Sequence, residues 1–152
     1  VITLLLDVLK GIVVILLSRL VKNIAGTDEI YPVISYIAGV CVSLGHNFPL
    51  YFGFKGGKGV ASAFGFILLT QPMIALAALF IWLIMAFTFR YSSLSAIVAA
   101  LAVPLITFFY APPIYTIFYS ALVVLVLIRH HANIGRLIKG EESKIHLKKQ
   151  EK

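Results

Sequence analysis

Residues 45–60 read GHNFPLYFGFKGGKGV, and they separate two apolar runs of the chain. Within them, residues 53–59 hold four glycines and two lysines, Lys55 and Lys58. Glycine lacks Cβ, so the backbone can adopt positive φ and place successive N–H groups around one ligand. Lysine ammonium groups beside such N–H groups favour an anion, and phosphate in particular. The stretch therefore predicts a phosphate-binding loop between two apolar segments.

The rest of the chain is strongly apolar. It has 152 residues, of which 61% are hydrophobic and 12% charged, with a mean hydropathy of +1.00. Apolar runs near twenty residues have the length that a membrane helix needs, and they lack the alternation of barrel strands. The sequence therefore predicts an all-α, polytopic integral membrane helix bundle.

Charge and cysteine content narrow the class further. The net charge of +7 comes from loops and the C-terminal tail, which is typical of the cytoplasmic side of a membrane protein and does not favour nucleic acid as a partner. The single cysteine, Cys41, lies in an apolar run and argues against a disulfide framework or a thiolate metal site.

Six apolar segments are predicted to cross the membrane, at residues 1–21, 31–45, 60–70, 73–89, 92–109 and 114–128. Segment 60–70 would span roughly 17 Å of a bilayer core of about 30 Å, so it is either re-entrant or a crossing in a thinned region. Residues 129–152 hold seven basic and three acidic residues, which predicts a cytoplasmic C-terminus. If segment 60–70 crosses, the glycine–lysine stretch and both chain ends are cytoplasmic, while the loop with Asp28 and Glu29 is outside. We favour that arrangement.

A second polar cluster follows the last apolar segment, where residues 129–142 read RHHANIGRLIKGEE. His130 and Asn133 lie one helical step apart on one face. They fall on the same predicted side of the membrane as the glycine–lysine stretch, so the two clusters could build one site. The alternative is a basic flank that only meets anionic headgroups. We expect His131 to be a surface neighbour rather than a ligand.

Charges also occur inside the first apolar segment. Asp7 and Lys10 are three residues apart and share a helical face, so they either pair at the membrane end or line a polar interior. The chain opens within an apolar run on Val1 rather than on methionine, and we expect an N-terminal portion to be missing.

Several chemistries find no support in these motifs. A Walker-type phosphate loop needs serine or threonine after its lysine, but Gly59 follows Lys58. The four histidines show no H-E-x-x-H spacing for zinc, and no G-x-S-x-G elbow is present. Lysines in a channel filter would oppose cations. A membrane site for a phosphorylated substrate remains, with neighbouring spans able to hold an acyl chain.

At this point the sequence resembles the bacterial acyl-phosphate-dependent glycerol-3-phosphate acyltransferases, the PlsY family, over nearly its whole length. The family's second motif resembles residues 45–61, with Ser62 where threonine is commoner. Its third motif resembles residues 130–142, at the positions of His130, Asn133, Ile134, Arg136, Leu137, Gly140 and Glu142. The segment LDVLKG at residues 6–11 is also similar to the family. The family's first motif, with a serine and an arginine, would precede Val1, so we expect a fragment of a seven-span protein.

The resemblance implies transfer of an acyl group from acyl phosphate to the 1-hydroxyl of glycerol 3-phosphate, giving 1-acylglycerol 3-phosphate and phosphate. It implies no cofactor and no metal. Residues 1–142 would form the transmembrane acyltransferase domain of a monomer in the bacterial inner membrane, with the site facing the cytoplasm, and residues 143–152 a basic cytoplasmic tail. The catalytic residues would be Lys58, His130 and Asn133.

The expected substrate-binding residues are His46, Lys55, Gly56, Gly57, Gly59, Arg136 and Glu142. Two of these assignments have alternatives: Lys55 could equally contact headgroups, and His46 could brace the loop. Whether His130 is a general base or only a hydrogen-bond donor is left open, since a substrate phosphate could take the proton. A transporter or flippase-like module for a phosphorylated solute is the alternative function, and a structural membrane subunit is a third.

Overall fold

A computed structural model describes residues 2–26 and 30–145 of the chain. The regular structure of these residues is helical, which agrees with the predicted class. Its elements are α1 (Ile2–Ala25), α2 (Tyr31–Asn47), the 3₁₀ turn η1 (Leu50–Phe52), α3 (Val60–Thr70), α4 (Pro72–Phe89), α5 (Ser92–Tyr110), α6 (Pro113–Arg129) and α7 (His131–Lys139). Val1, the loop with Asp28 and Glu29, and residues 146–152 of the predicted tail lie outside the described residues.

Glycine and proline set the ends of the helices, as the sequence indicates for most of them. Helix α3 has the predicted bounds, because Gly59 precedes it with φ of +78° and Pro72 opens α4 directly after its end. The first membrane segment is predicted to end at residue 21, and the helix itself is longer. Helix α1 continues to Ala25, since Lys22 and Asn23 are compatible with a helix, and it stops at Gly26 with φ of +63°.

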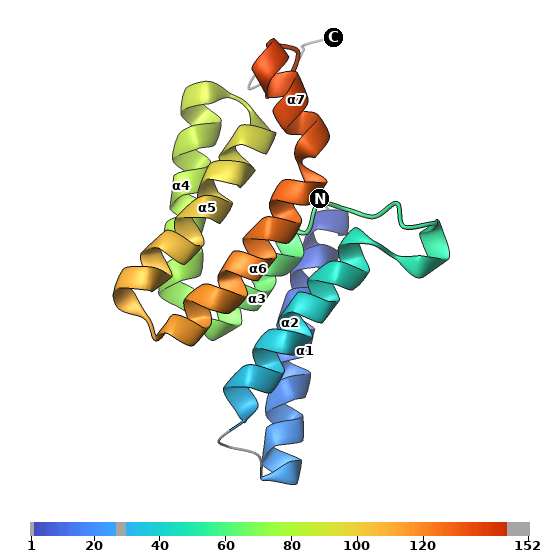
Figure 1. The fold of residues 1–152 in the computed structure, drawn as a ribbon, viewed down its shortest axis with the longest axis vertical. Coiled ribbons are helices and arrows are strands. Elements are labelled where there is room, and N and C mark those ends of the chain that lie inside the picture. The colour runs from blue at the N-terminus through green and yellow to red at the C-terminus, as the bar shows by residue number, and fades with distance from the viewer. Residues whose placement is uncertain (1, 27–29, 146–152) are drawn as a thin grey trace.

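The helices form three groups (Figure 1). Helices α4 and α5 make an antiparallel pair on one side, α1 and α2 lie on the other, and α3 and α6 lie between them. Helix α1 contacts α3 closely through Gly11 and Gly65. A Cβ at Gly11 would meet the backbone N of Phe66 at 2.6 Å, and one at Gly65 would meet the backbone of Val8. Small residues thus let these two backbones approach, as in other membrane helix pairs.

An aromatic core joins α2, α3 and α6. The ring of Tyr36 packs edge-on against Phe66, with ring centroids 5.3 Å apart, and stacks on Phe118. Tyr119 is fully buried, and its hydroxyl lies 2.7 Å from Oγ1 of Thr70. A buried phenol needs such a partner, so this contact ties α6 to the end of α3.

The apolar helices suit a bilayer. Segment Tyr31–Phe52 and helices α4 and α5 are long and apolar enough to cross it, and α6 with α7, bent by 59°, would make a fourth span. Two helices fall outside these candidate spans: α1 carries the charged residues Asp7, Lys10 and Arg19, and α3 has only 11 residues. Large apolar side chains such as Phe80 and Phe108 are exposed on the outside, which a lipid environment would cover. The count of six crossings stays a prediction.

Candidate functional site

One cavity of about 790 Å³ runs into the bundle between the helices. Its polar end is lined by residues from six parts of the chain, namely Asp7, His46, Gly57, Lys58, Gly59, Ser93, His130, Asn133, Arg136 and Glu142. Its other walls are apolar and come from α3, α4, α5 and α6, with Phe64, Ile67, Leu79, Trp82, Val103 and Leu122 among them. The glycine–lysine stretch and the second polar cluster therefore share one cavity, which has a polar end and an apolar body.

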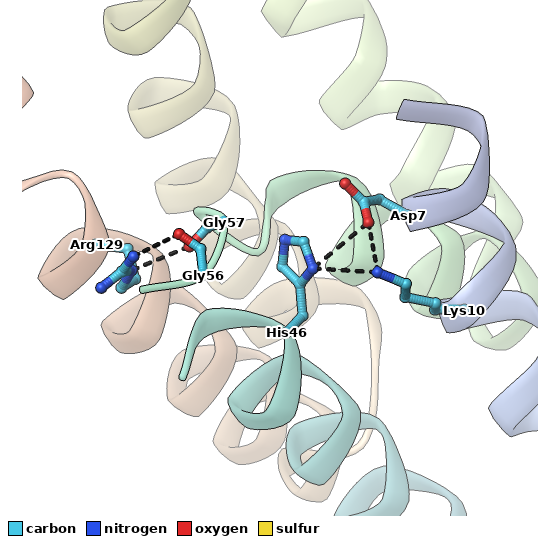
Figure 2. A network of polar contacts seen from close by, with 6 residues as sticks. All are labelled: Asp7, Lys10, His46, Gly56, Gly57 and Arg129. Atoms are coloured by element: carbon cyan, nitrogen blue, oxygen red, sulfur yellow. Dashed lines mark hydrogen bonds and ion pairs between the residues drawn. The ribbon is translucent and has the colours of Figure 1, made fainter. Parts of the chain in front are cut away.

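Residues 56–59 form a turn, called the glycine turn below, and Arg129 at the end of α6 holds it in place. Its Nε donates a hydrogen bond of 3.0 Å to the carbonyl oxygen of Gly57, and its Nη2 donates one of 2.6 Å to that of Gly56 (Figure 2). The guanidinium also lies over the ring of Phe48, 5.2 Å from its centroid. Two carbonyl groups of the turn are thus fixed toward Arg129 and away from any anion in the cavity.

The backbone N–H groups of the turn are not all available to a ligand. Gly57 donates its N–H to the carbonyl oxygen of His46 at 3.2 Å. Gly59 has φ of +78°, and a Cβ there would meet Oδ1 of Asn47 at 2.7 Å, so only glycine fits at this position. Within the described part of the chain, the N–H groups of residues 58–61 have no acceptor, and those of Val60 and Ala61 open α3. The N-terminus of α3 thus offers an anion site at the cavity wall.

His46 links this turn to α1. Its Nδ1 lies 3.4 Å from Oδ1 of Asp7 and 3.5 Å from Nζ of Lys10, which itself pairs with Asp7 at 2.7 Å (Figure 2). Its Nε2 side packs against Gly57, where a Cβ would collide with the imidazole ring. Asp7 and Lys10 therefore do pair, and Asp7 also lines the cavity.

His130 lies at the junction of α6 and α7 and is 1% exposed. Its Nδ1 is 2.8 Å from the carbonyl oxygen of Val126, and because a carbonyl only accepts, Nδ1 carries the proton. Burial lowers the pKa of His130, and the nearby Lys58 lowers it further, so the ring is neutral near pH 7. Nε2 then keeps its lone pair for a ligand in the cavity. The ammonium of Lys58 makes no hydrogen bond or ion pair with any described residue.

Glu142 organises the remaining wall of the polar end. Its Oε1 accepts hydrogen bonds from Ser93 at 2.6 Å and from Nδ2 of Asn133 at 2.7 Å, while Oε2 pairs with Nε of Arg136 at 2.6 Å. Its side chain is only 6% exposed. The hydrogen bond from Ser93, with those from Asn133 and Arg136, lowers the pKa of Glu142 to about 2. One carboxylate thus fixes the amide of Asn133 beside the cavity.

Replacing Glu142 by glutamine tests this arrangement. Because folding lowers the carboxyl pKa from 4.5 to about 2, the ionised group stabilises the fold above about pH 4.5, and that contribution is lost as the pH falls from 4.5 through 2. We expect Glu142→Gln to lower Tm by a few degrees at pH 7. The deficit should narrow below pH 4.5. Thermal unfolding in detergent across this pH range measures it, with the exposed neighbour Glu141 changed to glutamine as the control. A deficit independent of pH would contradict the argument.

Most, but not all, of the site residues expected from the sequence line the cavity. Those that line the cavity are His46, Gly57, Lys58, Gly59, His130, Asn133, Arg136 and Glu142. Lys55 and Gly56 do not line it; Gly56 directly precedes the lining residue Gly57, and its carbonyl oxygen accepts a hydrogen bond from Arg129. His131 is exposed. Within residues 2–26 and 30–145, no three His, Cys, Asp or Glu side chains are grouped so that they could hold a metal ion.

Sequence reasoning missed three contributors to this region. Arg129 was included in the second polar cluster but was given no role, and its position next to His130 was the only signal that it belonged to the site. Ser93 had no signal, because it lies 49 residues from its partner Glu142. For Asp7 the sequence left open an ion pair or the lining of a polar interior, and its approach to His46 depends on how α1 packs.

Comparisons with known proteins agree with this geometry. The family model described as glycerol-3-phosphate acyltransferase matches residues 1–140. A glycerol-3-phosphate acyltransferase of Neisseria gonorrhoeae is 48% identical over 146 residues, which are 94% of this chain and 70% of the relative. One of Rhodospirillum rubrum is 44% identical over 149 residues, which are 97% of this chain and 68% of the relative.

Two solved structures have a similar fold. A crystal structure of PlsY, an integral membrane glycerol 3-phosphate acyltransferase, in its glycerol 3-phosphate form aligns with a TM-score of 0.83 at 32% identity, over 95% of this chain and 70% of that one. Its lysophosphatidic acid form aligns with a TM-score of 0.81 at 33% identity, over 95% and 71%.

Proposed function

The chain belongs to the glycerol-3-phosphate acyltransferase family and is an integral membrane enzyme of the PlsY type, and from this premise we propose that its acyl donor is acyl phosphate. In this proposal the 1-hydroxyl of glycerol 3-phosphate attacks the acyl carbon. The bond from that carbon to the phosphate oxygen breaks, and 1-acylglycerol 3-phosphate and phosphate leave.

The observation that carries the proposal is the lining of the cavity described above. Its polar end combines Lys58 with the free N–H groups at the start of α3, which suits phosphoryl oxygens. Its body is lined by apolar side chains such as Phe64 and Trp82, which suit an acyl chain. An acyl phosphate has both chemical parts, and its carbonyl would lie where they meet, near His130 and Asn133.

The reaction asks little covalent chemistry of the protein, because phosphate is already a good leaving group. The site mainly has to place two anions together and offset the charge that develops. In our proposal Lys58 and the N–H groups of residues 58–61 hold the phosphate that leaves. The N–H of Gly57 is already bonded to His46, so Gly57 does not bind the phosphate. It has no side chain and thereby leaves room for the imidazole ring of His46.

His130 and Asn133 would position glycerol 3-phosphate. With Nδ1–H fixed on Val126, Nε2 of His130 accepts a hydrogen bond from the attacking hydroxyl. Asn133 gives one N–H to Glu142, and its amide is held toward the cavity beside Arg136. The proton of the hydroxyl then passes either to Nε2 or to a substrate phosphate.

A reconstitution assay separates this proposal from the transporter alternative. The purified full-length protein is reconstituted into sealed vesicles, which receive acyl phosphate and radiolabelled glycerol 3-phosphate. We expect labelled lysophosphatidate and an equal amount of released phosphate. Labelled glycerol 3-phosphate that enters the vesicles unchanged would instead support a transporter or flippase-like module. Product formed with acyl coenzyme A and not with acyl phosphate would keep the family and overturn the donor.

Orientation and assembly belong to the same proposal. The basic residues after α6 favour a cytoplasmic position for the polar end of the cavity, in the inner membrane of a bacterium. The monomer expected from the family resemblance stays part of this proposal. The domain would extend over residues 1–142.

Arg129 gives a test of how the turn is held. Arg129→Lys keeps the charge but cannot donate to two carbonyl oxygens in a fixed fork, so both carbonyls become free to rotate toward the anion. Losing a hydrogen bond to a charged group costs about 1.5–3 kcal/mol, so we expect kcat/KM to fall about tenfold to hundredfold. Arg19→Lys is the matched control, because Arg19 also donates to a backbone carbonyl, that of Leu69, but lines no part of the cavity. Equal effects of the two substitutions would contradict this role.

A further inference from the structure

The segment between α2 and the glycine turn has an exposed apolar tip. Residues 49–55 read PLYFGFK. Leu50 is 73% exposed, Tyr51 97%, Phe52 74% and Phe54 56%. Four large apolar side chains next to one another in a connecting loop would be costly in water, so something covers this tip.

The tip is a closed turn rather than a loose loop. Four backbone N–H groups are bonded within it: those of Phe52 and Phe54 to the carbonyl of Pro49, that of Gly53 to Leu50, and that of Lys55 to Phe52. Phe54 has φ of +62°, which is unusual for a residue with a side chain and turns its ring outward with the others. These four donors would therefore lose no partner if the tip left water.

The tip projects sideways from the bundle (Figure 1). In that view α1 and α2 run along the long axis, and the segment after α2 extends away from them at the level where α2 ends. Helix α2 already carries exposed apolar residues, including Ile37 and Leu44, which a bilayer would cover. The tip therefore continues a lipid-facing surface at the end of a membrane helix.

We propose that residues 50–54 insert into the boundary between headgroups and acyl chains, on the side of the membrane where the glycine turn lies. The composition fits this position, because aromatic rings, and Tyr in particular, favour the interface. Lys55 follows directly, with its ammonium at headgroup level. The depth would be about 5–10 Å, as for amphipathic interfacial segments. The glycine turn begins at the next residue, so the insertion holds the mouth of the cavity at the membrane surface.

Fluorescence quenching tests the insertion. The chain has one tryptophan, Trp82, so Trp82→Phe removes the background, and Tyr51→Trp then places a reporter on the most exposed residue of the tip. The protein is reconstituted into phosphatidylcholine–phosphatidylglycerol vesicles that carry bromine at shallow or at deep acyl positions. We expect shallow bromines to quench the reporter about twofold more than deep ones, and aqueous iodide to quench it less than free N-acetyltryptophanamide.

Two further variants make the result decisive. Phe80→Trp in the same background reports from the middle of α4 and should respond most to deep bromines. Phe52→Trp repeats the measurement at a second tip position. Full quenching of the tip by iodide would overturn the proposal and show a solvated tip. Shielding from both iodide and bromine would also overturn it, since a protein partner or a second copy of the chain would then cover the tip.

Discussion

Replacing Lys58 by alanine is expected to reduce lysophosphatidate formation about a thousandfold, the scale found when one preorganised charge or donor is removed from an active site. Lys58 lines the cavity, and its ammonium has no hydrogen-bonding or ion-pairing partner among the described residues. A cation without a partner beside free N–H groups attracts an anion. Its loss therefore removes charge stabilisation from the leaving phosphate without breaking a hydrogen bond or ion pair among the described residues.

The measurement is the initial rate of labelled lysophosphatidate formation from acyl phosphate by the reconstituted protein. Lys139→Ala is the matched control, because it removes the same charge from an exposed position in α7 that does not line the cavity. We expect the control to keep most of the activity and both variants to keep the Tm of the unsubstituted chain. Near-normal activity of Lys58→Ala would show that the phosphate is held elsewhere, and the proposed assignment of this site would fail.

Much of the fold could be predicted because the strongest local signals lie at the helix ends. Gly59 and Pro72 set the two ends of α3 at the predicted residues. Gly59 supplies positive φ, and Pro72 disfavours helix in the residue before it. The predicted membrane segment stops at residue 21, before the polar residues, whereas α1 itself is longer. A helix can continue through Lys22 and Asn23 into the polar region, and only Gly26 stops it.

The shared cavity was predicted for a different reason. The glycine–lysine stretch and the pair His130 and Asn133 were assigned to the same side of the membrane by counting crossings, and they do line one cavity. The sequence could not show which N–H groups are free. The bond from Gly57 to His46 and the bonds from Arg129 to the turn depend on packing between segments 11 and 72 residues apart. These contacts remove the N–H of Gly57 from the expected anion site and leave those of residues 58–61, at the start of α3.

The polar end of the cavity is also more balanced in charge than its lysines suggested. Asp7 is paired with Lys10, and Glu142 with Arg136, so the carboxylates there are already neutralised. Among the described residues that line the cavity, Lys58 is the cation that belongs to neither pair. The two carboxylates therefore position His46 and Asn133 without opposing a phosphate, and a single ammonium can dominate the local potential.

Replacing Gly56 by alanine is expected to lower kcat/KM by at least about a hundredfold, because a displacement of about 1 Å in a positioning element can cost that much. A Cβ at Gly56 would meet the backbone carbonyls of His46 and Asn47, the latter at 2.7 Å, and these atoms belong to α2 and cannot rotate away. The turn must move instead, and with it Lys58. Gly45→Ala is the control, since a Cβ there meets no atom within 4 Å. Equal activity of the two variants would show that the position of the turn does not matter.

Combining this change with Arg129→Lys tests whether the two residues act through the same turn. Gly56→Ala displaces the carbonyl group that Arg129 binds, so the bond would already be weakened in the single variant. We therefore expect the double variant to lose little more activity than Gly56→Ala alone, whereas distant and independent sites add their effects. Fully additive losses would mean that Arg129 supports the reaction by another route, for example through its charge on an anion in the cavity. A subadditive result would identify the guanidinium as the support that fixes the turn, and with it the N–H groups at the start of α3.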